Sequence, residues 1–359
     1  MSVVAGGGAN LRDLRRHNRA LLLAEIRRTG GLSRIELATR SGLSQQAVSK
    51  IVPELMAAGL LEEHRATAGG VGKPRTRLTI RPTARYAVGL QMDRDEVRGV
   101  RTDLIGTIAA HAAVSLQPGF DPPTAVAAIT RCVTTLCADV DRTAVLGVGM
   151  GVFGPLDHRR GVIHAATGLP HWQEVPLRAH LTDALGLPVV LDKDTNAAAH
   201  AYLWRAENTA AATAVVLIGT GLGVGLLIDG AVYRGPHTHA GEFGHTTLAH
   251  DGPPCRCGRH GCLEVLHHSA TNQQEAARLL GIGLANLVQL LDLERIVLAG
   301  RAVLAAPELY RRQTRAQLAT LPPAPHRPRV HVDIDHLGPD LVALGAATEL
   351  LHTFYTDPR

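Results

Sequence analysis

The sequence predicts two unlike parts, a small, mainly helical winged helix-turn-helix domain followed by a larger α/β domain. The first part is indicated by three short helical segments with capping residues, all before residue 60. The second is indicated by apolar runs of strand length from residue 86 onward, which alternate with helical patterns such as 122–140 and 281–291. At 359 residues the chain has room for both parts.

Composition and charge narrow the class of protein. The net charge is +5, and much of the Lys and Arg falls in residues 11–85, which is compatible with nucleic-acid binding. No signal-peptide pattern opens the sequence and no apolar run reaches about 18 residues, so we expect a cytoplasmic protein and no membrane span. Cys132 and Cys137 fall on different faces of an apolar helix and are expected to lie in the core.

The first eighty residues have the pattern of a helix-turn-helix. A leucine-rich helix is expected at 11–28. Ser33 is placed to cap the next helix, with Glu36 three residues later completing a capping box. Ser44 is placed to cap a third helix that runs to residue 58. Two helices joined by a short turn, after a leading helix, are typical of DNA-binding modules.

The third helix and the segment after it carry groups suited to DNA. Amides, hydroxyls and a lysine on this helix match base edges and phosphates in the major groove. Short strands at 60–62 and 78–80 flank a basic, glycine-rich loop, which predicts a wing. A helical dimerisation module with a solvated basic loop is the alternative. The candidate DNA-binding residues are Ser33, Arg34, Ser44, Gln45, Gln46, Ser49, Lys50, Lys73 and Arg75.

A histidine and three cysteines predict a metal site. Zn²⁺ takes four tetrahedral nitrogen or sulfur ligands, and a closed set of four leaves no position for a catalytic water. Glycines between the second and third cysteines permit the tight turns that such a site needs. Free buried thiols are the alternative. The proposed ligands of a structural zinc are His245, Cys255, Cys257 and Cys262.

These motifs resemble those of the ROK family (repressors, open reading frames and sugar kinases). The resemblance is carried by E-x-G-H at 242–245, by C-x-C-G-x-x-G-C-x-E at 255–264, and by S-R-x-E-L-A and V-S-K-I-V-x-E-L in the first domain. It implies an actin-like, ribonuclease H-like α/β sugar-kinase fold in two lobes. We therefore expect the winged helix-turn-helix domain at 11–82 and a ROK-type domain at 83–359. The small, glycine-rich residues 1–10 predict a disordered tail before them.

The same resemblance implies a sugar pocket. Asp194 stands at the family's catalytic base, which accepts the proton of a sugar hydroxyl. Lys193 replaces an asparagine that normally contacts the sugar. It would pair with Asp194 and hold it ionised, meet an anionic ligand, or face solvent. The ligand-binding residues implied by the resemblance are Gly154, Lys193, Asp194, Glu242, His245 and Glu264.

The nucleotide half of this implied site departs from the family pattern. Sugar kinases of this fold carry D-x-G-x-T in their first hairpin, where this chain has Gln-Met-Asp-Arg-Asp at 91–95. The second glycine-rich loop, 219–225, is intact. Arg301 stands beside Gly300 where a glycine pair usually supports adenosine, and would crowd that site.

The sequence therefore predicts a sugar-responsive transcriptional regulator, a repressor, in which Asp194 is a vestigial base and no residue is catalytic. Its expected partners are double-stranded operator DNA, a sugar or sugar-derivative effector, and further copies of itself in a homodimer or a dimer of dimers. Two alternatives stay open. One is an ATP-dependent sugar kinase with an appended DNA-binding domain, and the other is a ROK-type regulator with no small-molecule effector.

Overall fold

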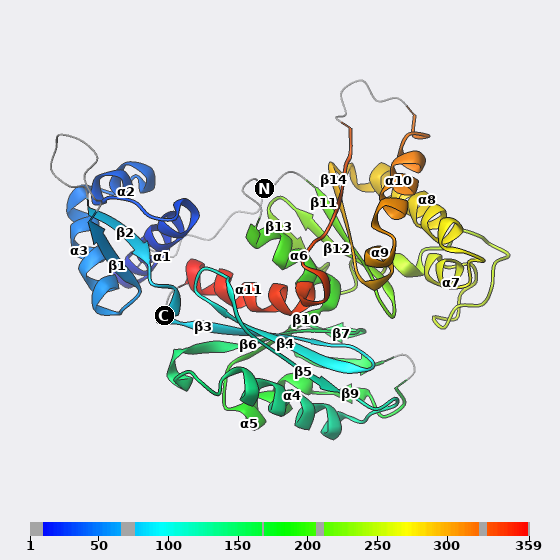
Figure 1. Cartoon of the computed structure of the whole chain (residues 1–359), viewed down its shortest axis with the longest axis horizontal. Coiled ribbons are helices and arrows are strands. Elements are labelled where there is room, and N and C mark those ends of the chain that lie inside the picture. Colours follow the sequence, from blue (N-terminus) through cyan, green and yellow to red (C-terminus); the bar gives the residue numbers. More distant parts are fainter. Residues whose placement is uncertain (1–9, 66–75, 167–168, 206–211, 323–328, 358–359) are drawn as a thin grey trace.

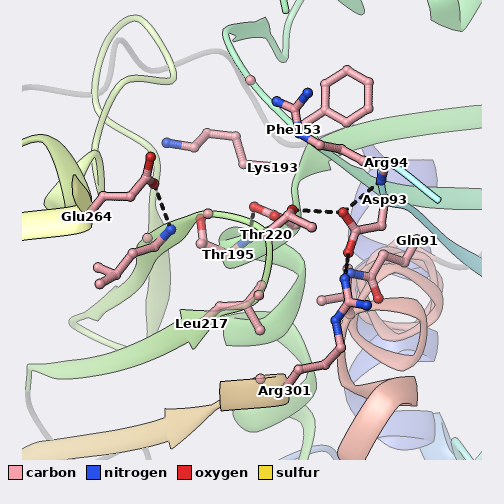
Figure 2. A pocket seen from close by; sticks show the side chains of 18 of the residues that line it. Gln91, Asp93, Arg94, Phe153, Lys193, Thr195, Leu217, Thr220, Glu264 and Arg301 are labelled. Atoms are coloured by element: carbon pink, nitrogen blue, oxygen red, sulfur yellow. Dashed lines mark hydrogen bonds and ion pairs between the residues drawn. The ribbon is translucent and has the colours of Figure 1, made fainter. Parts of the chain in front are cut away.

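The protein is described here by a computed structural model that covers residues 10–65, 76–166, 169–205, 212–322 and 329–357. Figure 1 shows a small N-terminal domain at one end and two α/β lobes beside it, with the C-terminal helix between them. Residues 1–9 of the expected tail lie outside the described residues, as do Lys73 and Arg75 of the expected wing loop.

The N-terminal domain is a winged helix-turn-helix. Ser33 caps the second helix in the predicted capping box with Glu36, and Ser44 accepts from the Ala47 N–H at the start of the third. The two wing strands pair antiparallel, with Leu61 opposite Ile80. The elements are α1 (Leu11–Thr29), α2 (Arg34–Ser41), α3 (Gln45–Ala57), β1 (Leu61–Arg65) and β2 (Thr76–Ile80).

The first lobe is built on a five-stranded sheet with strand order β10-β6-β3-β4-β5. Its β6 reads Val-Leu-Gly-Val-Gly-Met-Gly-Val and is almost entirely buried, as expected for a strand covered on both faces. The strands are β3 (Tyr86–Met92), β4 (Glu96–Asp103), β5 (Ile108–Ser115), β6 (Val145–Val152) and β10 (Val189–Lys193). Helices α4 (Pro122–Leu136) and α5 (Leu177–Leu185) and the small sheet β7 (Leu156–Asp157), β8 (Val162–Ala165) and β9 (Gln173–Val175) complete it.

The second lobe repeats this plan with the sheet order β13-β12-β11-β14-β15. Its strands are β11 (Thr213–Ile218), β12 (Leu222–Ile228), β13 (Ala231–Tyr233), β14 (Arg295–Ala299) and β15 (His331–Ile334). Its helices are α7 (Leu263–His268), α8 (Gln273–Leu291), α9 (Arg301–Ala305) and α10 (Pro307–Leu318). Of the described helices, none has the length and apolarity that a membrane crossing would require.

Two helices, α6 (Asp194–Arg205) and α11 (Leu341–Thr356), lie between the lobes. They approach each other so closely that a Cβ on Gly345 would lie 1.7 Å from the Ala197 carbonyl oxygen. A Cβ on Gly89 or Gly149 would likewise meet the backbone of α11, at 1.9 and 2.0 Å. Glycine at these positions lets the first sheet and both helices pack backbone against backbone.

The N-terminal domain is joined to this central pair by a shared apolar core. Buried side chains of α1 and α3 belong to the same cluster as Leu351, Phe354 and Tyr355 of α11. The guanidinium of Arg27 in α1 lies 3.9 Å from the ring centroid of Trp204, near the end of α6. The far ends of α6 and α11 therefore contact the N-terminal domain.

Two predicted helix limits are wrong. Helix α4 ends at Leu136 rather than at residue 140, since Cys137 already leaves helical geometry as its C-cap. Helix α8 begins at Gln273 rather than at residue 281, because the Asn272 side chain caps it by accepting from the Glu275 N–H.

Candidate functional site

A cavity of about 920 Å³ lies between the two lobes and is lined by residues of both. It brings together all six residues that were predicted to bind a ligand. Its lining is rich in charge, with six basic side chains and five carboxylates. They are Arg94, Arg98, Lys193, Arg256, Arg259 and Arg301, and Asp93, Glu96, Asp194, Glu242 and Glu264.

Lys193 is the last residue of β10. Two of its expected positions, facing solvent or paired with Asp194, are not found in the structure. Its side chain is almost fully buried. Its Nζ donates to the Ala240 carbonyl at 3.0 Å and to a Glu242 carboxylate oxygen at 2.5 Å. Lys193 therefore compensates the charge of Glu242 and fixes the position of that carboxylate in the cavity wall.

Asp194 begins α6 at the floor of the cavity. Burial raises the pKa of its carboxyl to about 6, and the neighbouring charges of Asp93 and Glu242 act in the same direction. The Thr195 N–H and the Lys193 charge act in the opposite direction but are outweighed. Lys193 thus favours the ionised form of Asp194, but its effect on the pKa is smaller than that of burial.

A buried charge network supports this floor from behind. The guanidinium of Arg234 lies 2.7 Å from a carboxylate oxygen of Asp192 and 2.7 Å from one of Glu349, and it contacts His200 Nε2 at 2.9 Å. Asp192 in turn accepts from the Lys193 N–H and from Asn196 Nδ2, each at 2.8 Å. Asp192, His200 and Glu349 could hold a cation by their spacing, but Arg234 supplies that positive charge.

Two features of this network, the neutral His200 and the pairing of Arg234 with Glu349, could not be predicted from the sequence. Burial lowers the pKa of His200 to about 3, so its imidazole is neutral beside Arg234. Arg234 and Glu349 are 115 positions apart and belong to no motif that we identified. A pairing at that separation left no signal in a single sequence.

The turn between β11 and β12 forms the glycine-rich edge of the cavity. The hydroxyl of Thr220 donates to Asp93 at 2.9 Å, and the Leu222 N–H donates to Glu264 at 2.9 Å. Glu264 is therefore held against the turn, in the cavity wall where the resemblance implied it. The second glycine-rich loop is present as a β-hairpin turn.

A second edge of the cavity, which shares Asp93 with the first, is crossed by ion pairs between the lobes. Arg301 at the start of α9 lies 3.1 Å from Asp93 and 3.4 Å from Asp95, both in the turn between β3 and β4. The sequence predicted that Arg301 would crowd this part of the cavity. In the structure its guanidinium extends to the turn at residues 93–95 rather than pointing away from the cavity.

The four predicted metal ligands converge beside this cavity. Their nitrogen and sulfur atoms all lie within 4.8 Å of one another. Cys255 Sγ is 3.5 Å from His245 Nδ1, and Cys257 Sγ is 3.6 Å from Cys262 Sγ. One nitrogen and three sulfurs at this spacing fit a four-coordinate metal ion. The chain turns tightly around them, since Gly261 has φ +59° and a Cβ there would lie 1.6 Å from the Ala249 carbonyl oxygen.

The cluster is continuous with the carboxylate wall of the cavity. His245 follows Glu242 within one turn of 3₁₀ helix, Phe243–His245. Cys262 is the N-cap of α7, whose second residue is Glu264. A metal bound here would therefore fix the wall from which both carboxylates project.

Only some of the residues predicted to contact DNA have exposed side chains without another role in the fold. Four residues in the first half of α3 are exposed: Gln45, Gln46, Ser49 and Lys50. Ser44 is also exposed, but its side chain caps this helix. Ser33 is used in its capping box, and Arg34 pairs with Glu63 of β1. The exposed face of α3 is therefore the part of the candidate DNA interface that the structure describes.

Comparison with known proteins relates both parts of the chain to described families. Residues 88–273 match the ROK family, and residues 13–70 match the MarR family. The xylose repressor of Bacillus spizizenii is 28% identical over 252 residues, which cover 69% of this chain and 65% of that protein. The chain thus spans just under two thirds of that relative's length.

Solved structures agree with the fold over both parts. A ROK family transcriptional regulator described as a homologue of the E. coli MLC protein matches 96% of this chain and 98% of its own, with a TM-score of 0.77 at 20% identity. A ROK family glucokinase from Streptomyces griseus, in complex with glucose and AMPPNP, matches 73% of this chain and 98% of its own, with a TM-score of 0.63 at 26% identity. The chain belongs to the ROK family.

Proposed function

We propose that this protein is a DNA-binding transcriptional repressor whose ROK domain binds a sugar or sugar derivative. The observation that carries the proposal is the exposed polar face of α3, presented by a winged helix-turn-helix that is seated on a cavity-bearing domain. Its similarity to a xylose repressor supports both halves of the proposal.

DNA recognition is assigned to α3. In helix-turn-helix proteins the N-terminal residues of this helix reach base edges in the major groove. Gln45, Gln46 and Lys50 carry groups that pair with adenine or guanine edges or with phosphate. Lys73 and Arg75 of the wing are assigned to phosphate or the minor groove. Because a palindromic operator matches a two-fold symmetric protein, we assign the protein a homodimer or a dimer of dimers.

Communication between the ligand and the DNA is assigned to α6 and α11. Helix α6 begins at Asp194 in the cavity and carries Trp204, which stacks on Arg27 of α1. Helix α11 has Val342 in the cavity wall and Tyr355 in the core shared with α1. A ligand that binds one arrangement of the lobes more tightly shifts the population of DNA-binding geometries through these helices.

The Cys₃His cluster is assigned a structural zinc. Four soft or borderline donors in a closed set suit Zn²⁺ and leave no open position for a reacting water. The ion would fix the wall that carries Glu242 and Glu264. His245 would both bind this ion and line the cavity.

We assign no kinase activity to the protein. The turn after β3 places Arg94 where a phosphate would need free access to backbone N–H groups, and Arg301 is engaged at the same edge. The favoured alternative is a sugar kinase, which Asp194 and the similarity to a glucokinase support. ATP turnover with a hexose that disappears in Asp194→Asn would establish that alternative.

Operator binding tests the proposal. Genomic fragments would be selected on the full-length protein, and the affinity for the selected site measured by fluorescence anisotropy. Gln45→Ala is expected to weaken specific binding by about 5- to 150-fold, because a bidentate base contact contributes roughly 1–3 kcal/mol. Gln273→Ala, an exposed glutamine at the start of α8, is the matched control and is expected to have no effect. Equal binding of selected and random DNA would refute the proposal.

The ligand part is tested on the same DNA. Free sugars and sugar derivatives would be titrated into the protein–operator complex. Loss of operator affinity with at least one of them is expected. Affinity that stays constant across the panel would favour the regulator without a small-molecule effector.

A further inference from the structure

The outer strands of the two main sheets differ in how their free edges are covered. In the first lobe, the Leu191 carbonyl of β10 is bonded by His158 Nδ1 at 2.7 Å. In the second lobe, Arg315 donates to the Val332 carbonyl of β15 at 3.2 Å, and β13 has only three residues. Strand β5 has eight residues, and no side-chain nitrogen or oxygen of the described residues is bonded to its backbone.

The sequence of β5 lacks the usual protection of a free edge. Natural sheets protect such edges with charged side chains, proline or bulges, because an open edge pairs with other strands. Strand β5 reads Ile-Ala-Ala-His-Ala-Ala-Val-Ser, and residues 104–117 hold no Asp, Glu, Lys or Arg. One bulge is present near Ala109, where the register with β4 shifts between Arg101 and Thr102. The regular, uncharged edge therefore runs from residue 110 to residue 115.

The hydrogen-bonding groups of alternate residues point out of this edge. The Leu116 N–H donates to the Asp95 carbonyl, which lies directly opposite in the register of β4 and β5. Bonded pairs alternate along an antiparallel ladder, so Val114 and Ala112 bond to β4 and the residues between them point outward. Within the described part of the chain, the outward N–H groups have no acceptor. The outward residues are His111, Ala113 and Ser115, and all three are exposed.

A second copy of β5 fits this edge. An antiparallel pairing centred on Ala113 places Ala113 opposite itself and His111 opposite the second copy's Ser115, so that the outward N–H and C=O groups of both strands find partners. Two methyl groups meet at the centre, and the His111 imidazole can share a hydrogen bond with the serine hydroxyl. A pairing centred on His111 would instead set two imidazoles against each other and run into the bulge near Ala109.

We propose that two copies of this chain pair through β5, antiparallel about Ala113, and so join their five-stranded sheets into one continuous sheet. This rests on the proposed function, which assigns a two-fold assembly, and it names the surface of that assembly. The lack of charge argues for self-pairing. An edge that selects a different protein uses charges to attract it and to exclude others, whereas a copy of the same strand needs only a matching backbone.

Opposite charges at Ala113 test the pairing on the full-length protein. Sedimentation velocity is expected to show a dimer for the wild type. Ala113→Glu and Ala113→Lys are each expected to weaken that dimer by about tenfold or more, because two like charges would face each other across the two-fold axis. An equal mixture of the two variants is expected to regain the wild-type dimer. Ala231→Glu, an exposed alanine on the edge strand β13, is the matched control and is expected to keep the dimer.

Two results of this experiment overturn the inference. One is a dimer that Ala113→Glu leaves as strong as the wild-type dimer. The other is a monomeric wild type, which would leave a strand of another protein as the occupant of this edge. Circular dichroism of each variant checks that a lost dimer is not a lost fold.

A cysteine at the centre tests the register independently of charge. Directly opposite residues in a bonded pair have Cα atoms about 5.5 Å apart, which a disulfide can span. Ala113→Cys is therefore expected to give a covalent dimer on mild oxidation, whereas the wild type and Ala231→Cys are expected to give none. A dimer in which Ala113→Cys does not cross-link overturns the inference.

Operator affinity separates this inference from the proposed function. Operator affinity that falls with the dimer in Ala113→Glu, and returns in the mixture with Ala113→Lys, supports both. A dimer through β5 that binds no operator supports the inference and overturns the repressor. Operator binding by a dimer that Ala113→Glu leaves intact keeps the repressor and overturns only the pairing through β5.

Discussion

The two edges of the cavity are stabilised in different ways. On one edge, Glu242 is held by the buried Lys193, and Glu264 lies two residues after the fully buried Cys262. On the other edge, Arg301 and Asp95 meet with 61% of each side chain exposed. The first edge is fixed by burial and by a cluster with metal-ligand geometry, whereas the second depends on ion pairs that water and salt can exchange.

We therefore expect the two edges to have different roles in ligand binding. A wall fixed before binding has little freedom to lose when a ligand arrives, so it sets which ligand fits. Exposed ion pairs contribute about 0–1 kcal/mol and so cannot by themselves lock the lobes together. We therefore expect the edge at Arg301, rather than the fixed wall, to adjust when a ligand binds.

The largest effect is expected at the cysteine cluster. Cys262→Ser removes one of four ligands and is expected to abolish metal binding and to lower the free energy of unfolding by more than about 3 kcal/mol. Elemental analysis and urea unfolding measure both. Cys132→Ser, a buried thiol of the first lobe outside the cluster, is the control and is expected to keep the metal. Purified protein without about one Zn²⁺ per chain would contradict the zinc assignment.

An intermediate effect is expected at Asp194, which lies between the two edges and is repelled by a carboxylate of each. Its raised pKa, about 6, means that the folded state binds this proton more tightly than the unfolded chain does. This group therefore destabilises the fold increasingly as pH rises from about 4 to 6, and the penalty persists above that range. Asp194→Asn is expected to gain on the order of 2 kcal/mol at pH 7.5.

The pH dependence supplies the control for this prediction. The gain from Asp194→Asn is expected to shrink toward zero as the pH is lowered toward 4, because the wild-type carboxyl becomes neutral there. Urea unfolding at pH 4.5 and pH 7.5 measures the difference. Asp251→Asn, an exposed carboxylate, is expected to show no such trend. A gain that is the same at both pH values would mean that charge is not its cause.

The smallest effect is expected at the exposed edge. Arg301→Met is expected to lower the free energy of unfolding by less than about 1 kcal/mol at low salt, and by nothing measurable at about 0.5 M NaCl. Arg278→Met breaks a similarly exposed pair within α8 and is the matched control. A loss above about 2 kcal/mol that persists in salt would show that the two edges are held equally firmly.

Local signals allowed much of this molecule to be predicted from sequence. The capping box at Ser33 and the grouping of His245 with three cysteines depend on spacings of a few residues, and both are present. The partner of Lys193 could not be predicted, because Glu242 is 49 positions away and nothing local distinguishes it from the adjacent Asp194. Arg234 was missed for the same reason. The wing cations Lys73 and Arg75 and the assignment of α3 to DNA stay predictions.

The backbone contact between Gly345 and Ala197 has a mechanical consequence. No side chains separate α6 from α11 at that point, so the contact has little room to deform. We therefore expect the two helices to move together as one rigid body. Helix α11 has 16 residues and is about 24 Å long. A tilt of about 5° at its cavity end displaces its far end, where α1 is seated, by roughly 2 Å. Small changes in lobe closure would thereby be amplified into larger displacements of the N-terminal domain.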